Sequence, residues 1–327
     1  METDFGQDIP ERGGRGQVGH VPVLLKEAID FLAVQRGGTY LDATVGLGGH
    51  SLEIAKRLGA PGHLIGFDKD PKALQIAAKK LAVRYSSFAD REVPSEQRSA
   101  NDDQRDWPTV TLIQGSFADL ANSEQRTTYD GILADLGVSS LQLEDAARGF
   151  SFQADGPLDM RMNPMSGSTA EQVVNRISER ELADVIYEFG EERRSRRIAR
   201  AIVRSRPIQT TKQLADVISA AARPMNAAER RIHPATRTFQ ALRIFVNREL
   251  DDLKALLEAA PRVLKPGGRL VVISFHSLED RIVKDALRTG KDKYFRLLTK
   301  KPVTASEEEI ASNPRARSAK MRAAERL

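Results

Sequence analysis

The fold of this chain is decided by residues 39–51, which read TYLDATVGLGGHS. Residues 39–43 are apolar and β-favouring, as in a buried parallel strand, and residues 51–58 have the spacing of an amphipathic helix. Between them, glycines within residues 46–49 allow positive φ and a close approach of the backbone to a ligand, while the helix offers free N–H groups at its start. This order of strand, glycine turn and helix predicts a loop that binds a nucleoside cofactor.

Two cofactor classes use such a loop. A dinucleotide fingerprint needs G-x-G-x-x-G so that the helix can hold a pyrophosphate, but here Ser51 stands at the last position and Gly49 is extra. A second strand, residues 63–67, ends at Asp68, which is placed to accept hydrogen bonds from both ribose hydroxyls of an adenosine. An acid there fits either cofactor. S-adenosylmethionine is favoured by three features: Asp42 at the end of the first strand, the departure from the phosphate-binding pattern, and the lack of an obvious hydride-transfer site.

Composition narrows the classes of protein to consider. The 327 residues, 40% of them hydrophobic, suffice for one large core or two smaller ones, and a net charge of +5 modestly favours an anionic partner. The absence of Cys excludes disulfides, thiolate metal sites and a Cys nucleophile, and the five His lack metal-ligand spacing, so no metal is predicted. Residues 1–19 are polar, and no later run is long enough to span a bilayer. We expect a disordered tail on a soluble, cytoplasmic protein that does not bind membranes.

Strand and helix patterns alternate along the first part of the chain. They comprise a helix at 21–34, a helix at 71–83, and strands at 109–113 and 129–134. Such alternation predicts a parallel sheet with helices on both faces. Residues 86–106 are polar with little apolar content, and we expect a mobile loop there.

Consecutive helices dominate the middle of the chain. From residue 142 to residue 245 no convincing strand occurs, and the clearest helical patterns are at 179–189, 193–205 and 211–222. The sheet is expected to resume with strands at 268–274, 294–299 and 318–325. We therefore expect an α/β fold in which 20–141 and 246–327 form the cofactor-binding domain. An all-helical insertion, 142–245, would recognise the substrate above the strand ends, where open α/β sheets bind ligands.

Six longer motifs follow one another along the chain. They are GLGGH at 46–50, DLGVSS at 135–140, GFSF at 149–152, LDMRM at 158–162, TRTFQALRIFVN at 236–247 and ISFHSLEDR at 273–281. In this combination the chain resembles the bacterial 16S ribosomal RNA cytosine-N4 methyltransferases over about residues 20–327. The resemblance implies a class I methyltransferase (Rossmann-like) sheet with an inserted helical domain. It also implies S-adenosylmethionine as cofactor and a cytidine N4 in the decoding region of 16S rRNA, in the small ribosomal subunit, as acceptor.

The resemblance also assigns residues to the cofactor pocket. Phe117 follows a strand end and would offer an apolar face to the adenine, although such a Phe is as often a core residue. Asp135 ends another strand, where the alternative role is a helix cap. The full set of expected cofactor-binding residues is Gly48, Gly49, His50, Asp68, Phe117, Asp135 and Gln142.

Methylation of an exocyclic amine needs a group that accepts a proton and holds the nitrogen in line with the methyl carbon. The D/N/S-P-P-Y/F segment common in amino-methyltransferases is absent, and Asp135 with the loop 137–140 occupies the equivalent place. Asp135, or a neighbouring backbone carbonyl of that loop, is the first candidate for the catalytic acceptor. Asp159 is the second, with Arg161 on a phosphate, although an Asp159–Arg161 ion pair explains the same residues equally well.

Arginines in the expected insertion predict contacts with RNA phosphates. The candidates are Arg193, Arg197, Arg200, Arg204, Arg237 and Arg243, and a solvated helix face is the alternative for the first four. Four cations near the C-terminus, at 315, 317, 320 and 322, alternate as on an edge strand and add a possible phosphate contact. Two other functions stay open, a methyltransferase with another acceptor and a non-enzymatic RNA-binding assembly factor for ribosomes. A homodimer is likewise left open.

Overall fold

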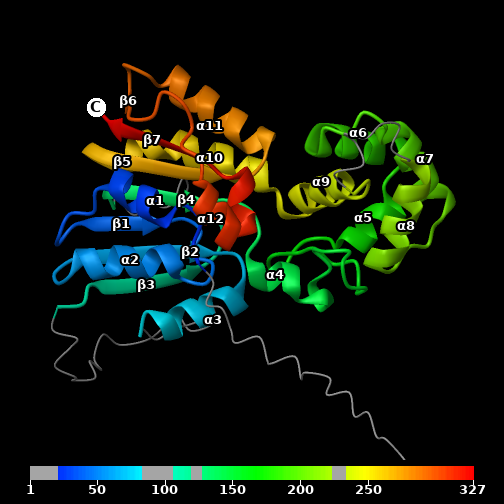
Figure 1. The fold of residues 1–327 in the computed structure, drawn as a ribbon, viewed down its shortest axis with the longest axis horizontal. Helices are drawn as coiled ribbons and strands as arrows, with labels where there is room; N and C mark the ends of the chain where they lie inside the picture. The colour runs from blue at the N-terminus through cyan, green and yellow to red at the C-terminus, as the bar shows by residue number, and fades with distance from the viewer. Residues whose placement is uncertain (1–20, 83–105, 119–126, 223–232) are drawn as a thin grey trace, which may run out of the picture.

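The computed structural model describes residues 21–82, 106–118, 127–222 and 233–327 (Figure 1). The expected disordered tail, 1–19, lies outside the described residues, and so does the expected mobile loop 86–106 except for Asp106.

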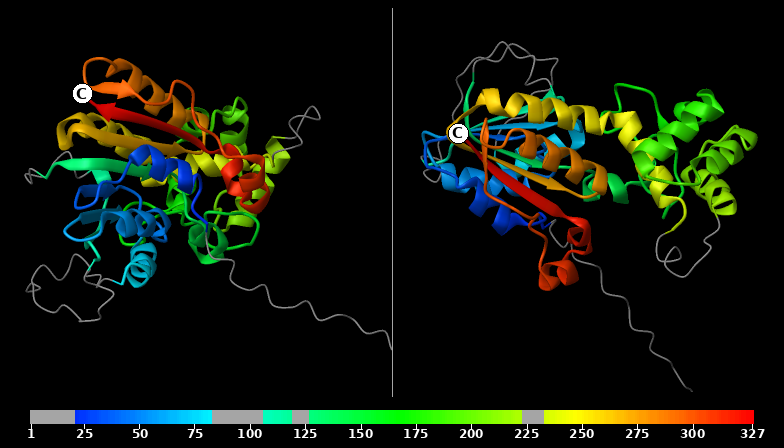
Figure 2. Two further views of the ribbon diagram at one scale, coloured as in Figure 1. Left: turned by 60° about the vertical axis from the view of Figure 1, so that its left-hand side comes forward. Right: turned by 90° about the horizontal axis from the view of Figure 1, so that it is seen from above.

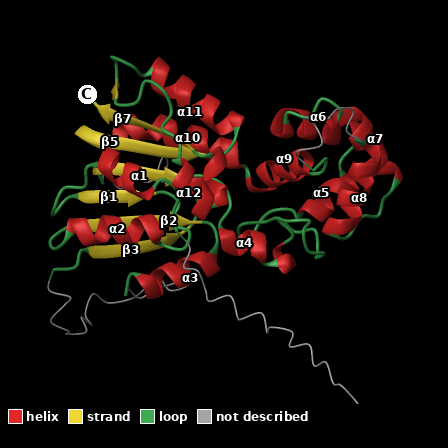
Figure 3. Ribbon diagram, in the orientation of Figure 1, coloured by secondary structure: helices red, strands yellow, loops and turns green. Residues whose placement is uncertain are grey.

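A seven-stranded sheet, whose strands are yellow in Figure 3, has the strand order β3-β2-β1-β4-β5-β7-β6. Neighbours from β3 to β5 pair in parallel, whereas β7 runs antiparallel to both β5 and β6. Chain order reverses between β1 and β4, which makes that point the topological switch where such sheets bind ligands. The expected α/β fold with a Rossmann-like sheet is confirmed. The strands are β1 Thr39–Asp42, β2 His63–Asp68, β3 Thr109–Gln114, β4 Tyr129–Asp135, β5 Leu264–Ser274, β6 Phe295–Leu297 and β7 Lys320–Arg326.

Helices cover both faces of the sheet, as the second view of Figure 2 shows. Successive side chains of a strand point to opposite faces, so Leu41 packs in the core under α10 and α11 while Tyr40 packs in the core under α1 and α2. Because both faces are covered, the inner strands are apolar on both sides. The covering helices are α1 Leu25–Leu32, α2 Gly49–Leu58, α3 Pro71–Lys80, α10 Glu249–Val263 and α11 Ser277–Thr289.

Between β4 and α10 the described residues form helices and no strand of the sheet. We call the helices of this segment, α4 to α9, the helical lobe. In Figure 1 the lobe stands beyond the carboxyl ends of the parallel strands. It has its own core, in which Leu182, Ile198 and Phe239 are buried. Its helices are α4 Ser140–Glu144, α5 Ala170–Arg176, α6 Glu179–Gly190, α7 Ser195–Arg204, α8 Thr211–Ala221 and α9 Thr236–Asn247, so α4 begins before 142 and α9 ends after 245.

Helices α5, α6 and α8 of the lobe begin with side-chain caps. Thr169, Ser178 and Thr210 each start a capping box in which the hydroxyl accepts from the third backbone N–H and a Gln or Glu returns the bond. These caps provide acceptors for backbone N–H groups in the first turn, which have no partner within the helix.

The C-terminal segment differs from the expectation. The predicted edge strand carrying Arg315 and Arg317 is wrong, since both lie in the 3-10 helix η5 Pro314–Ser318, after α12 Glu307–Ser312. β7 is an inner strand between β5 and β6, and Arg322 on it is buried and donates to Asp280 over 2.7 Å. The small residues that alternate there are explained by burial between two neighbouring strands.

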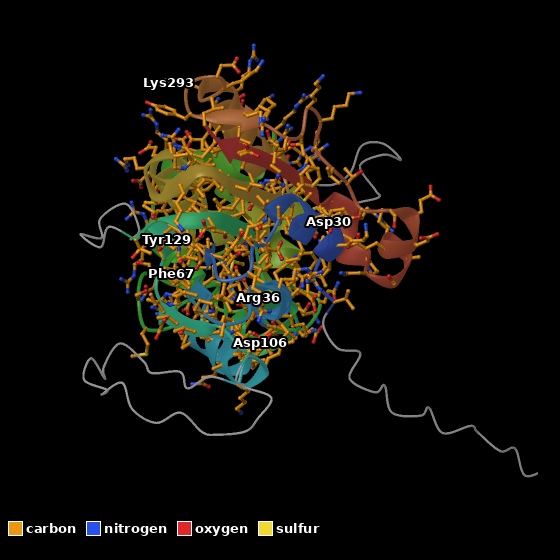
Figure 4. The ribbon with its side chains drawn as sticks, turned by 90° about the vertical axis from the view of Figure 1, so that its left-hand side faces the viewer. Asp30, Arg36, Phe67, Asp106, Tyr129 and Lys293 are labelled. Atoms are coloured by element: carbon orange, nitrogen blue, oxygen red, sulfur yellow. The ribbon has the colours of Figure 1, made fainter. Side chains whose placement is uncertain are left out.

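The amino ends of the parallel strands face away from the lobe and toward the viewer in Figure 4. There Arg36, from the loop before β1, forms an ion pair with Asp106, which precedes β3. The opposite, carboxyl end of the sheet is where open α/β sheets bind ligands, at the switch point between β1 and β4.

Candidate active site

A cavity opens at the carboxyl ends of β1, β2, β4 and β5, at the switch point of the sheet. Its space, open mouth included, is about 1090 Å³, large enough for a nucleoside cofactor and part of a second substrate. The β1–α2 loop and the strand ends form most of the wall. Met162 and Glu249 contribute from near the lobe, and Arg315 from η5.

The glycine loop forms the floor of this cavity. Gly46, Leu47 and Gly49 line it, and an added Cβ at Gly49 would stand 2.2 Å from Cγ of Pro22. Gly48 does not line the cavity. With a φ of 74° it is the residue before α2, and it packs against Ala77 of α3, so it shapes the turn rather than the wall.

Asp68 ends β2 and faces the cavity, as expected for a ribose-binding acid. Its Oδ2 accepts from Gly46 N over 2.8 Å and its Oδ1 accepts from Asp70 N over 2.8 Å. Each oxygen keeps a further lone pair for a ligand hydroxyl. Burial raises the pKa of Asp68 to about 6, against the two N–H donors, which lower it.

Phe117 and Gln142 line the same cavity. Phe117 is both a wall residue and a member of the sheet core, so the two alternatives weighed for it are not exclusive. Gln142 completes a capping box with Ser139 and donates from Nε2 to Asp70 Oδ2 over 2.9 Å. Its amide therefore fixes the start of α4 at the cavity wall.

Asp135 ends β4 in the cavity wall, 22% exposed, and is the most perturbed acid of the site. Its Oδ1 is buried and has no hydrogen-bond partner among the described residues. Its Oδ2 lies 3.6 Å from Nδ1 of His50, whose Nε2 is 3.1 Å from the carbonyl oxygen of Val23. Burial, together with the nearby charge of Asp42, raises the pKa of Asp135 to about 8.

A buried polar cluster connects the cavity to the lobe. Asp70, fully buried, accepts from Nη1 of Arg148 over 2.7 Å in addition to the bond from Gln142. The other end of the Arg148 guanidinium donates to the carbonyls of Arg161 and Met162, both over 2.9 Å. Because Met162 lines the cavity, this cluster sets the position of one wall.

Sequence reasoning missed several wall residues from the C-terminal third. Glu279 is 2% exposed and lines the cavity. Burial would raise its pKa, but the His276 ring, with Nε2 at 3.1 Å from Oε1, and the charge of Arg243 lower the pKa overall. His276 and Glu279 form a capping box at the start of α11, which was the available signal. Arg315 donates to Ser140 Oγ and to the carbonyl of Val138, so it holds the loop after β4.

Asp159 and Arg243 lie elsewhere than expected. Both oxygens of Asp159 accept from Arg161 over 2.8 Å, and Asp159 does not line the cavity. Burial opposes ionisation of Asp159, but the bonds from Arg161 lower its pKa overall. Arg243 is mostly buried and forms a two-pronged ion pair with Glu249 at 2.9 Å, so it braces the wall rather than facing solvent.

The other expected RNA contacts are at the surface. Arg197, Arg200 and Arg204 are exposed on α7, and Arg193 is exposed in the turn before it. Arg200 lies 3.3 Å from Glu179, and Arg237 lies 3.8 Å from Glu192. Their contact with RNA stays a prediction.

The described residues contain neither a cluster of metal ligands nor a membrane-spanning helix. Nowhere in the described chain do three or more His, Asp or Glu side chains gather as metal ligands would. Within the same residues, each helix is too short or too polar to cross a membrane.

Comparison with known proteins identifies the family. The model of the MraW methylase family matches residues 17–327. The chain belongs to the MraW methylase family. The resemblance inferred from the motifs is thereby confirmed, and this MraW methylase is an enzyme that uses S-adenosylmethionine as methyl donor.

Relatives of this MraW methylase cover nearly its whole length. The ribosomal RNA small subunit methyltransferase H of Koribacter versatilis is 67% identical and aligns over 99% of both chains. The protein of the same name from Acidobacterium capsulatum is 60% identical over 94% of this chain and 98% of its own. That from Bradyrhizobium diazoefficiens is 50% identical over 94% of this chain and 91% of its own.

Proposed function

We propose that this chain transfers the methyl group of S-adenosylmethionine to N4 of a cytidine in the decoding region of 16S rRNA, at position 1402 of that RNA. The names of the relatives support ribosomal RNA as the acceptor. The observation that carries the chemistry is Asp135, whose carboxyl group faces the cavity with one buried oxygen that accepts no hydrogen bond from the described residues.

The residues of the cavity fit the adenosyl part of the methyl donor. Asp68 has two oxygens with spare lone pairs for the ribose hydroxyls, and Phe117 offers an apolar surface for the purine. The glycine loop lets the backbone approach closely. The donor supplies a methyl group that is already activated on a sulfonium, so the chain needs no metal to activate it.

Asp135 is the better of the two candidates for the amine acceptor. The lone pair of a cytosine amine is delocalised into the ring, so attack on the methyl carbon requires an acceptor for an N4 proton. The Asp135 side chain is 22% exposed in the cavity wall and its Oδ1 accepts no hydrogen bond from the described residues, whereas both oxygens of Asp159 are used by Arg161 outside the cavity wall. Among the loop carbonyls considered as alternatives, that of Val138 accepts from Arg315.

The helical lobe would recognise the RNA. It stands over the cavity end of the sheet, and the exposed arginines of α7 give it a positive surface for phosphates. The target base must leave its stack to reach a cavity of this kind, so we expect an accessible or flipped cytidine. The expected insertion, 142–245, is in this view the substrate-recognition domain.

Methyl transfer can be followed directly. Small ribosomal subunits and their free RNA are incubated with labelled S-adenosylmethionine, and the RNA is digested to nucleosides for mass spectrometry. We expect N4-methylcytidine with the wild type and with the surface variant Asp30→Asn, whose side chain is 61% exposed, and none with Asp135→Asn. Label in another molecule would favour a different acceptor. RNA binding without label in any product would favour an assembly factor.

A further inference from the structure

The backbone carbonyl of Val23 determines which nitrogen of the His50 ring carries a hydrogen. His50 Nε2 lies 3.1 Å from the carbonyl oxygen of Val23, and a carbonyl oxygen can only accept, so Nε2 carries a hydrogen. In the neutral ring Nδ1 is then the acceptor nitrogen. This nitrogen faces Oδ2 of Asp135 at 3.6 Å. Two acceptors therefore face each other unless one of the two groups binds a proton.

The surroundings favour one proton on this pair. Two further acids face Asp135, Asp42 at the end of β1 and Glu279 in α11, and both disfavour another negative charge. Arg315 of η5 acts in the opposite direction. Burial is the largest effect and, with these charges, raises the pKa of Asp135 to about 8. The 3.6 Å separation is too long for a hydrogen bond, but catalytic contacts are often long in unliganded enzymes and shorten on binding.

We propose that Asp135 and His50 share one proton in the unliganded enzyme, that binding of the cationic methyl donor releases this proton, and that methyl transfer returns a proton to the pair. This inference rests on the proposed function. It makes Asp135 a catalytic residue whose ionisation is controlled by the charge of the donor. His50 becomes a positioning residue that acts through Asp135.

The charges balance across the step. With the donor bound, the pair carries one negative charge beside one positive sulfonium. Asp135 then takes the proton that N4 loses as the N4 lone pair bonds to the methyl carbon and the C–S electron pair returns to sulfur. The products are a neutral thioether and a neutral pair. The cavity therefore keeps the same net charge through the reaction, and no charge is left buried without a partner.

Proton release on binding tests this without any turnover. S-adenosylmethionine and S-adenosylhomocysteine share their adenosine, amino and carboxyl groups and differ in the sulfonium charge. Calorimetry at pH 7 in buffers of different ionisation enthalpy should show about one more proton released with S-adenosylmethionine than with S-adenosylhomocysteine. Relative to S-adenosylhomocysteine, its affinity should rise by up to about tenfold per pH unit between pH 6 and 8 and level off above.

Two variants separate the roles of the pair. Asp135→Asn should abolish the extra proton release and the pH dependence of the affinity ratio. His50→Gln can retain the bond to Val23 but has no Nδ1, so the pH midpoint of release should fall because protonated Asp135 loses its acceptor. If His50 had only a structural role, that midpoint would not change, and this result would overturn the positioning role proposed for His50. Asp30→Asn should match the wild type.

The failures can be told apart. Equal proton release with both ligands would overturn the shared proton while leaving the proposed function intact, because S-adenosylmethionine would still bind. No binding of S-adenosylmethionine would overturn the proposed function and this inference together.

Discussion

Replacing Arg148 by Met would remove the positive half of the buried ion pair between the helical lobe and the sheet. Arg148 and Asp70 have side chains that are 9% and 0% exposed, and three donor contacts of the guanidinium would be lost with it. Removing one partner of a buried pair costs about 3–5 kcal/mol. Asp70 would keep the bonds from Lys72 N and Gln142, so we expect a loss of about 3 kcal/mol, the lower end of that range.

Urea unfolding of the unliganded protein measures this loss. The matched control is Arg248→Met, because Arg248 pairs with Asp251 at the surface, where its side chain is 77% exposed and the pair contributes about 0–1 kcal/mol. A loss below about 1 kcal/mol for Arg148→Met, similar to the control, would refute the reasoning that this cluster holds the lobe on the sheet. Since Arg148 also positions Met162 in the cavity wall, KM for RNA should rise in the same variant.

Gly48→Ala should cost about 2 kcal/mol of unfolding free energy, because φ is 74° and the new Cβ would lie 3.1 Å from that of Ala77. Gly167→Ala, with a φ of 78° and open space, should cost about 1 kcal/mol, and equal losses in urea would contradict the packing effect. Asp68→Asn should weaken S-adenosylmethionine binding roughly 10–100-fold in calorimetry, and an unchanged affinity would exclude a ribose contact. Because the pKa of Asp135 is higher in the folded protein than in the unfolded chain, protonation of Asp135 stabilises the fold. This stabilisation is complete below the pKa of the unfolded chain and is lost as the pH rises through about 8. The unfolding free energy of Asp135→Asn minus that of the wild type should therefore increase by at least about 1.4 kcal/mol between pH 5 and pH 8 in thermal unfolding. A difference that does not change with pH would refute this prediction. Replacing the α7 arginines by Gln should lower RNA affinity and reduce the steepness of log K against log salt by about 2, while the urea midpoint of unfolding stays unchanged. An unchanged slope would mean that this face does not contact RNA. The residues changed are Arg197, Arg200 and Arg204.

The parts of the site that were predictable from sequence are those encoded locally. The strand at 39–42, the turn after it and the acid at 68 come from short patterns whose geometry follows from strand and glycine preferences. Parallel pairing of β1 with β2 then brings the turn and Asp68 together without any further information. The helices of the lobe were also visible, because 3.6-residue periodicity is a local pattern.

The missed residues depend on contacts that are distant in sequence. Glu279 and Arg315 reach the cavity because β5 pairs with β4 and η5 packs behind the loop after β4. The alternation around Arg315 was misinterpreted because an edge strand and an inner strand after a turn share small residues. Asp159 was ambiguous for a physical reason, since an Asp two residues before an Arg suits an ion pair as well as a base contact.

The place of β7 between β5 and β6 has a consequence for the cavity that β7 itself does not line. β7 covers the edge of β5, and Arg315 of the neighbouring η5 donates to the carbonyl of Val138 in the loop after β4. Detachment of β7 would expose the backbone groups of β5 and free η5 from its place at the cavity wall. A bound ligand should therefore slow hydrogen exchange in a strand that it does not touch.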